Sequence, residues 1–211
     1  LAEPGWDAPA AFELLADYDI PVTRSKAARD LAGALAAATE IGYPVALKTL
    51  GAEHKSDVGG VVLGVPDPDG LRGAYLTMAE ALGPEVSVDA MAARGVEISV
   101  GVVRDDNFGP LVIVAAGGTL VELLADRAVA CPPLTRDTAA EMLRSLRTAP
   151  LLAGWRGATA VDIDALADVV VGFSRLATEL GEHLDAVEAN PVIAAPDAAV
   201  AVDALVIPRR H

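Results

Sequence analysis

Cysteine is nearly absent from this sequence. Cys131 is the one thiol in 211 residues, so no internal disulfide can form, and we interpret it as a small apolar residue in a reducing cytoplasm. No apolar run approaches the roughly 18 residues of a membrane span, and no charged leader precedes an apolar run at the N-terminus. We therefore expect neither a membrane protein nor an exported one. The chain begins with Leu rather than Met, which predicts a domain of a longer polypeptide.

Basic residues are also scarce. The sequence has 16 Lys and Arg against 30 Asp and Glu, for a formal net charge of −14. Nucleic acids and anionic membrane surfaces attract clustered positive charge, so neither is expected as a partner. An acidic protein that binds a polyphosphate must supply metal ions and locally placed lysines, and these are the features to look for.

Aromatic residues make up only 4% of the chain, while hydrophobic residues make up 53%, so the core must be built from small side chains such as Ala and Val. Apolar residues recur at both helical and strand spacing, which predicts a mixed α/β (α+β) chain. Helices are expected at 7–18, 26–41, 68–82, 135–146 and 162–180. Strands are expected at 45–48, 61–65, 86–90, 96–103, 110–115, 184–188 and 199–204. Gly83-Pro84 is the clearest break, and it predicts two lobes, 1–84 and 85–211.

A polar, glycine-rich stretch at 49–60 connects two of the expected strands. Gly59-Gly60 lets backbone N–H groups approach phosphate oxygens, although a Gly-Gly before a strand is more often an ordinary turn. Lys48 ends the preceding strand and could neutralise a triphosphate, or could be an exposed strand-end lysine. The stretch is not a Walker A loop, because it lacks the Gly-Lys-Ser/Thr spacing and no helix follows.

A second polar group lies near the C-terminus. Glu188 and Asn190 are two residues apart and point the same way on an extended segment, and Asp203 lies on the next strand-like run. Singly, each is more often a solvated turn residue. As a set, their carboxylate and amide oxygens are the ligands that Mg²⁺ prefers, so they predict a metal site.

These features together resemble the ATP-grasp domain of the ADP-forming acyl-CoA synthetases, relatives of the succinyl-CoA synthetase β subunit. Matching segments run from about 11 to 205. They are 41–48, 54–61, 95–97, 106–110, Gly117-Gly118, Glu122, Asp126, Gly154-Trp155-Arg156-Gly157, 188–191 and Asp203.

The resemblance implies two α/β lobes that grip ATP between them. It also implies the reaction acid + CoA + ATP ⇌ acyl-CoA + ADP + phosphate, with the phosphoryl group carried as phosphohistidine. ATP or ADP would be contacted by residues of both lobes: Lys48, Gly59, Gly60, Val88, Asp89, Met91 and Glu97. Asn190 and Asp203 would bind Mg²⁺, and Glu188 would act beside the phosphoryl group or the metal. Asp89 stands near the adenine hinge, where relatives often carry Gln or Glu.

His54 is the candidate phosphoryl carrier. It shares a loop with Gly59-Gly60, Lys55 beside it supplies positive charge, and some members of the resembling family phosphorylate a histidine in this motif. A neutral imidazole is a competent nucleophile near pH 7, although a lone histidine is more often a surface-loop residue.

CoA binding and the acid-activating histidine belong to other parts of these enzymes. The expected partners are therefore CoA-binding and ligase domains of the same polypeptide or an alpha subunit, and we expect an oligomer when full length. The alternative is a regulatory, catalytically silent ATP-grasp module fused to a protein acyltransferase. The presence of Lys48, His54, Asn190 and Asp203 together favours the active enzyme. A structural scaffold would leave them as surface residues.

Overall fold

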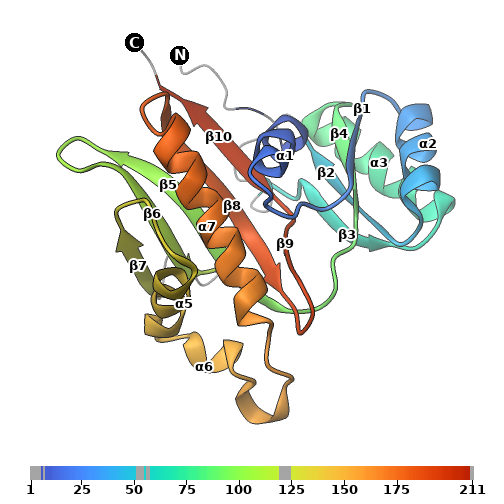
Figure 1. The fold of residues 1–211 in the computed structure, drawn as a ribbon. Helices are drawn as coiled ribbons and strands as arrows, with labels where there is room; N and C mark the ends of the chain where they lie inside the picture. Colours follow the sequence, from blue (N-terminus) through green and yellow to red (C-terminus); the bar gives the residue numbers. More distant parts are fainter. Residues whose placement is uncertain (1–5, 7, 51–54, 56–57, 119–124, 210–211) are drawn as a thin grey trace. The chain divides into compact units, whose positions relative to one another are not determined.

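The computed structural model describes residues 6, 8–50, 55, 58–118 and 125–209. The chain divides into two compact units: residues 1–22 with 93–211 form unit 1, and residues 23–92 form unit 2 (Figure 1). No helix among the described residues is both long enough and apolar enough to cross a membrane.

This division differs from the predicted lobes 1–84 and 85–211. The Gly83-Pro84 break follows a helix whose C-cap is Gly83, but the next strand pairs with two strands of unit 2 and so remains in that unit. At the other end, residues 8–17 form a helix with Ala11 and Leu15 in the core of unit 1. Pairing and packing, rather than the turn signal, set the boundaries.

Unit 2 is a four-stranded antiparallel sheet in the order β1-β4-β2-β3 with two helices. Its elements are β1 Ser25–Ala28, α2 Leu31–Ile41, β2 Val45–Thr49, β3 Val61–Val65, α3 Pro68–Leu82 and β4 Val86–Ala90. Both helices begin at aspartates, because Asp30 and Asp67 accept hydrogen bonds from the first-turn amides of Gly33 and Gly70. The helices and one sheet face enclose an apolar core.

Unit 1 is built on a six-stranded antiparallel sheet in the order β10-β8-β5-β6-β7, with β9 pairing β8. Its strands are β5 Val96–Asp105, β6 Gly109–Ala116, β7 Arg127–Ala130, β8 Leu184–Ala194, β9 Ala199–Ala201 and β10 Ala204–Pro208. Its helices are α1 Ala8–Asp17, α5 Arg136–Ser145, α6 Ala149–Leu152, the 3-10 turn η2 Trp155–Gly157 and α7 Ile163–Leu180.

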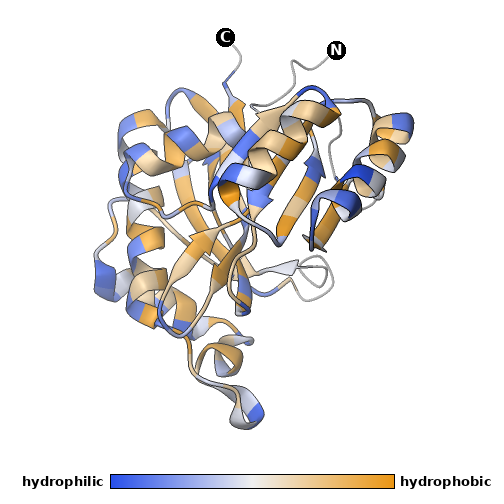
Figure 2. Ribbon diagram, turned by 90° about the vertical axis from the view of Figure 1, so that its right-hand side faces the viewer, coloured by the Kyte–Doolittle hydropathy of each residue, from blue (hydrophilic) through white to orange (hydrophobic). Residues whose placement is uncertain are grey.

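Helix α7 covers one face of this larger sheet (Figure 1). Phe173 and its neighbours on α7 are fully buried against alternate strand residues such as Val100 and Val187. Figure 2 shows apolar colouring running through the strands, while the helices alternate between polar and apolar positions. Alternation along the strands leaves the face opposite α7 less buried, with polar residues such as Glu188 beside apolar ones such as Leu205.

Two of the expected element boundaries are corrected by the structure. The helix predicted at 26–41 begins only at Leu31, because the Asp30 side chain caps it and residues 25–28 pair with β4 instead. The strand predicted at 184–188 continues to Ala194, since β5 and β9 pair with its second half. Strands β7 and β10 were not expected as separate elements.

Candidate functional site

Lys48 lies on the face of the smaller sheet that points away from α2 and α3. On β2, Val45 and Leu47 enter the core of unit 2, so Lys48 points to the opposite face. Its Nζ lies 2.9 Å from Asp89 Oδ2, and both residues are buried, with Lys48 6% and Asp89 1% exposed. The Ser25 hydroxyl donates to Asp89 Oδ1 at 2.5 Å. Two predicted nucleotide contacts, Lys48 and Asp89, are thus brought together in a buried ion pair.

Gly59 and Gly60 close the turn that leads into β3. Gly59 has a φ of +71°, the left-handed region that glycine enters without steric cost. The Gly60 amide donates to the Lys55 carbonyl at 2.7 Å, and its carbonyl accepts from the Thr49 amide at 2.9 Å. A Cβ at Gly60 would lie 2.6 Å from Thr49 Cγ2. The turn itself therefore requires both glycines, and their contact with phosphate stays a prediction.

Val88 and Met91 lie on either side of the end of β4. The Val88 side chain is fully buried in the core of unit 2, on the face opposite Asp89. Met91 follows the strand and is exposed. Any contact of Val88 with a nucleotide would have to come from its backbone.

His54 lies outside the described residues. Lys55, which follows it, is described and is partly buried in the turn before Gly59. The role of His54 as a phosphoryl carrier therefore stays a prediction.

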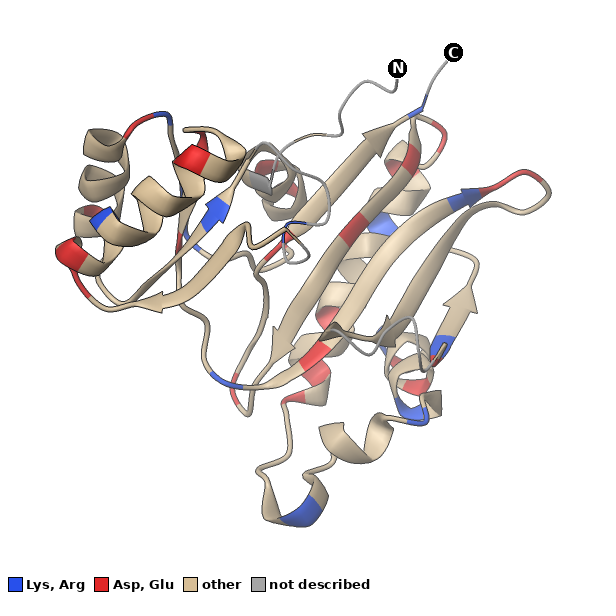
Figure 3. Ribbon diagram, turned by 180° about the vertical axis from the view of Figure 1, so that it is seen from behind, with Lys and Arg blue, Asp and Glu red and all other residues tan. Residues whose placement is uncertain are grey.

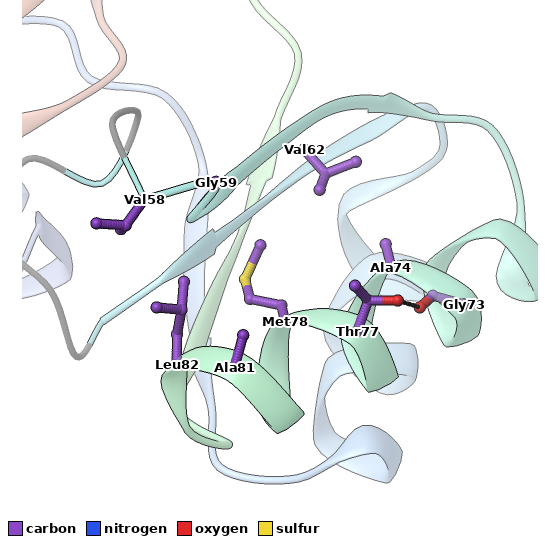
Figure 4. Close-up of a pocket in the computed structure, with 9 residues that line it drawn as sticks. All are labelled: Val58, Gly59, Val62, Gly73, Ala74, Thr77, Met78, Ala81 and Leu82. Carbon is purple, nitrogen blue, oxygen red and sulfur yellow. Dashed lines mark hydrogen bonds between the residues drawn. The ribbon is translucent and has the colours of Figure 1, made fainter.

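A pocket of about 400 Å³ in unit 2 lies between β3 and α3 (Figure 4). It is lined mostly by small and apolar residues, and Gly59 is the one predicted site residue in its lining. Its Thr77 hydroxyl already donates to the Gly73 carbonyl at 3.1 Å. Because no charged side chain lines the pocket, it does not suit a triphosphate.

The predicted metal ligands come together on the larger sheet of unit 1. The backbone N–H of Asn190 donates to the backbone carbonyl of Asp203 at 3.2 Å. Asn190 on β8 and Asp203, the residue just before β10, are therefore direct neighbours. Glu188 lies two residues before Asn190 and opposite Leu205, and its Oε1 accepts from the Ser99 hydroxyl at 2.8 Å. Figure 3 shows acidic positions along the strands of this sheet.

The donor set fits magnesium. Two carboxylates and an amide supply hard oxygen ligands, and Mg²⁺ commonly keeps waters and takes only one or two protein carboxylates. If Glu188, Asn190 and Asp203 hold Mg²⁺, water or phosphate must supply the remaining ligands, because the described residues contain no cluster of three or more His, Cys, Asp or Glu placed to hold a metal.

A register shift beside this site brings Ser99 into it. Ile98 pairs with Val192 and Val100 pairs with Ala189, so Asn190 and Pro191 together oppose Ser99 alone. The extra residue forms a bulge on β8, a feature common beside functional sites because it re-aims side chains. Sequence reasoning did not identify Ser99, although its place in the alternation of β5 puts it on the face opposite α7, the face that carries Glu188.

Glu97 lies at the start of β5, against the glycine pair that follows β6. The Gly117 amide donates to the Glu97 carbonyl at 2.8 Å. A Cβ at Gly118, which has a φ of +74°, would fall on the Glu97 carboxylate. The glycine pair therefore makes room for Glu97, whose predicted contact with nucleotide is untested.

Asp126 is a further buried carboxylate in unit 1, singled out above only as part of the resemblance. Its Oδ1 accepts from the Arg147 amide, and its Oδ2 accepts from the Thr148 amide and hydroxyl, each at 2.8 Å. Burial alone would raise the pKa of Asp126, but these hydrogen bonds and the Arg147 charge outweigh it and hold the pKa below its usual range. Asp126 thus joins the segment before β7 to the connection between α5 and α6.

The candidate residues therefore form two groups. Unit 2 carries the lysine, the glycine turn and Asp89, whereas unit 1 carries the predicted metal ligands and Glu97. Lys48 and Asp89 contact each other in unit 2, and Asn190 and Asp203 are neighbours in unit 1. Glu97 lies against Gly117 and Gly118 instead, and His54 lies outside the described residues.

Comparison with known proteins bears on both groups. A family model described as an ATP-grasp domain matches residues 6–207. The beta subunit of ADP-forming acetate–CoA ligase I from Pyrococcus furiosus is 40% identical over 209 residues, covering 94% of this chain and 90% of that subunit.

Two solved structures of acetyl-coenzyme A synthetase 1 from Ca. Korarchaeum cryptofilum are also similar. One, in complex with coenzyme A and Ca-AMPCP, has a TM-score of 0.92 at 33% identity and covers 98% of this chain and 94% of that chain. The other holds coenzyme A and Mg-AMPPCP, with its phosphohistidine segment pointing towards the nucleotide binding site. Its TM-score is 0.87 at 35% identity, over 98% of this chain and 94% of that chain.

Proposed function

This chain belongs to the ATP-grasp family, and from that membership we propose that it is the nucleotide-binding and phosphoryl-transfer part of an ADP-forming acyl-CoA synthetase. The reaction is acid + CoA + ATP ⇌ acyl-CoA + ADP + phosphate. The observation that carries the proposal is the similarity along almost the full length to the P. furiosus beta subunit, in a chain that retains Lys48 and the set Glu188, Asn190 and Asp203.

In unit 2, Lys48 would bind the nucleotide phosphates, since a lysine ammonium is a compact point charge with three N–H donors. The turn at Gly59 and Gly60 sets the entry into β3 next to that lysine, because Lys48 pairs with Val61. Phosphoryl transfer depends mainly on positioning and charge stabilisation, which a buried, fixed cation can supply.

In unit 1, Asn190 and Asp203 would hold Mg²⁺, which when bound neutralises charge on phosphate oxygens. Glu188 is oriented by the Ser99 hydroxyl at 2.8 Å, so its carboxylate is held on the same sheet face. We propose that Glu188 acts beside the transferred group or the metal. A fixed orientation of its carboxylate is what that role requires.

We propose His54 as the carrier of the phosphoryl group. Its imidazole nitrogen would attack the γ-phosphorus of ATP, forming a P–N bond as the bond to ADP breaks, and its proton would pass to solvent. The same group would then leave His54 for the acyl-forming site, and acid-labile label from γ-labelled ATP would identify it.

The remaining chemistry would come from partners. The Pyrococcus relative is named as a beta subunit, and we propose that CoA binding and acyl activation here belong to an alpha subunit or to further domains of the same polypeptide. We place the enzyme in the cytoplasm, where ATP and CoA are supplied, a location that cell fractionation can check.

Isothermal titration with ADP, with and without Mg²⁺, tests the proposal. We expect Mg²⁺-dependent binding, and Lys48→Ala should weaken it by about 1–3 kcal/mol, the scale of a lost charge-assisted hydrogen bond. Lys26→Ala is the matched control, because Lys26 lies on β1 of the same sheet and forms an ion pair with Glu40 on the helix-covered face. Absence of binding at millimolar ADP would contradict the proposal.

A further inference from the structure

Four polar side chains share the face of the smaller sheet opposite its helices. Ser25 on β1 lies directly opposite Asp89 on β4, and Lys48 on β2 lies directly opposite Ser87. Ser87 and Asp89 are two residues apart on β4, so Lys48 is the diagonal neighbour of Asp89, within reach of a long side chain. This set of Ser25, Lys48, Ser87 and Asp89 is called the lysine cluster below.

Each oxygen of the Asp89 carboxylate contacts another side chain of the smaller sheet. Oδ1 accepts from the Ser25 hydroxyl at 2.5 Å, and Oδ2 lies 2.9 Å from Lys48 Nζ. Asp89 is 1% exposed, so water contributes little to holding it. The Ser25 hydrogen bond on Oδ1 and the Lys48 ion pair on Oδ2, an oxygen that makes no hydrogen bond among the described residues, together restrict the orientation of this buried carboxylate and the position of the lysine ammonium.

The ion pair is compatible with phosphate binding. An ammonium carries three N–H donors, so a lysine that pairs with a carboxylate can also contact a phosphate. The neighbouring Ser87 hydroxyl is fully buried and makes no hydrogen bond among the described residues. Burying a hydroxyl without a hydrogen-bond partner costs free energy. The Ser87 end of the lysine cluster is therefore a place for a further hydrogen-bond acceptor.

We infer that Asp89 is a positioning residue that acts on the nucleotide through Lys48, with Ser25 fixing the carboxylate, and that it does not read the base. This inference rests on the proposed function. It differs from the sequence-based expectation that Asp89 contacts the nucleotide itself, because both of its oxygens are already engaged by Ser25 and Lys48.

A double-variant cycle on nucleotide affinity distinguishes the two roles. If Asp89 acts through Lys48, Asp89→Asn should weaken Mg–ADP binding about tenfold, the scale of one charge-assisted interaction. In a Lys48→Met background the same substitution should have no further effect. The ratio of Mg–ADP to Mg–GDP affinity should also stay unchanged, since no base contact is lost.

Ser25 supplies a second, milder test. Ser25→Ala should weaken Mg–ADP binding in the same direction as Asp89→Asn, and Ser25→Thr, which keeps the hydroxyl, should restore it. Thr23→Val is the matched control: Thr23 lies two residues before β1, and its hydroxyl donates to the Ala90 carbonyl at the end of β4 at 2.8 Å rather than to Asp89. Its removal should leave Mg–ADP affinity unchanged.

The experiment measures Mg–ADP and Mg–GDP dissociation constants by isothermal titration of the protein with its partner subunit or domains. Loss of affinity that disappears in the Lys48→Met background supports the inference. Loss that persists in that background, or a changed ADP-to-GDP ratio, overturns it in favour of a base contact. If Asp89→Asn does not fold, the effect of Ser25→Ala on Mg–ADP affinity is compared between the wild-type and Lys48→Met backgrounds instead. Wild-type protein that fails to bind Mg–ADP would refute the proposed function, whereas wild-type binding with unaffected Asp89 and Ser25 variants would refute only this inference.

Discussion

Asp126→Asn replaces a buried carboxylate that three donors surround. The Arg147 amide donates to Oδ1, and the Thr148 amide and hydroxyl donate to Oδ2, each at 2.8 Å. Asn offers one acceptor oxygen, so on the other side its NH₂ faces a donor. Hydrogen bonds to charged groups contribute about 1.5–3 kcal/mol each and are not additive, so we expect the free energy of unfolding at pH 7 to fall by about 2–3 kcal/mol.

The loss should depend on pH with a definite sign. The pKa of Asp126 in the folded state lies below its usual range, because hydrogen bonds and the Arg147 charge outweigh burial. Its stabilising contribution is therefore complete above the unfolded pKa of about 3.9 and is lost as the pH falls through the lower, folded value. The wild type and the variant should differ fully at pH 7 and converge as the pH falls below about 4.

Guanidinium denaturation at pH 7, 5 and 3 measures this difference. The control is Asp168→Asn, since Asp168 forms a hydrogen-bonded ion pair with Arg136 in which both side chains are at least half exposed. Exposed ion pairs contribute little, so this variant should stay close to wild type at every pH. The reasoning is refuted if Asp126→Asn costs no more than Asp168→Asn, or if its deficit grows as the pH falls.

Asn190→Ala and Asp203→Ala should weaken ADP binding in the presence of Mg²⁺ but not in its absence. Equal losses of affinity with and without Mg²⁺ would show that the metal site is elsewhere. Glu188→Gln should slow turnover of the complete enzyme more than it weakens ADP binding. Gly60→Ala should lower the melting temperature, because its Cβ would lie 2.6 Å from Thr49 Cγ2 and 2.9 Å from the Lys55 carbonyl. Gly73→Ala, in α3 where a Cβ meets nothing within 4 Å, should not lower it, and equal losses would argue against the packing account.

The smaller sheet shows what local patterns can predict. The strands at 45–49, 61–65 and 86–90 and the helix ending at Leu82 follow from alternation and capping, because both signals lie within a few residues. The strand predicted at 45–48 with Lys48 at its end continues to Thr49, so Lys48 is its next-to-last residue. Glu188, Asn190 and Asp203 were expected on one face of adjoining strands. The structure confirms that Asn190 and Asp203 are neighbours.

Contacts between distant segments escaped sequence reasoning. The pairing of Lys48 with Asp89 depends on the strand order β1-β4-β2-β3, which no local pattern encodes. The contact of Ser25 with Asp89 was missed because residues 26–41 were interpreted as one helix, which left no strand at 25–28 to pair with β4. Asp30, three residues before Gly33, is a capping signal that could have placed the helix start at 31. The partners of Asp126 lie 21 and 22 residues further along the chain.

Phosphorylation of His54 tests the central claim most directly. The complete enzyme is incubated with γ-labelled ATP and Mg²⁺, quenched in base, and the acid-labile label is mapped. We expect label on the peptide that contains His54 and ADP release in the wild type, neither in His54→Ala, and both in His183→Ala, a control at an exposed turn of unit 1. A His54→Ala enzyme that keeps normal acyl-CoA turnover, or a wild type in which this chain never becomes labelled, would contradict the account.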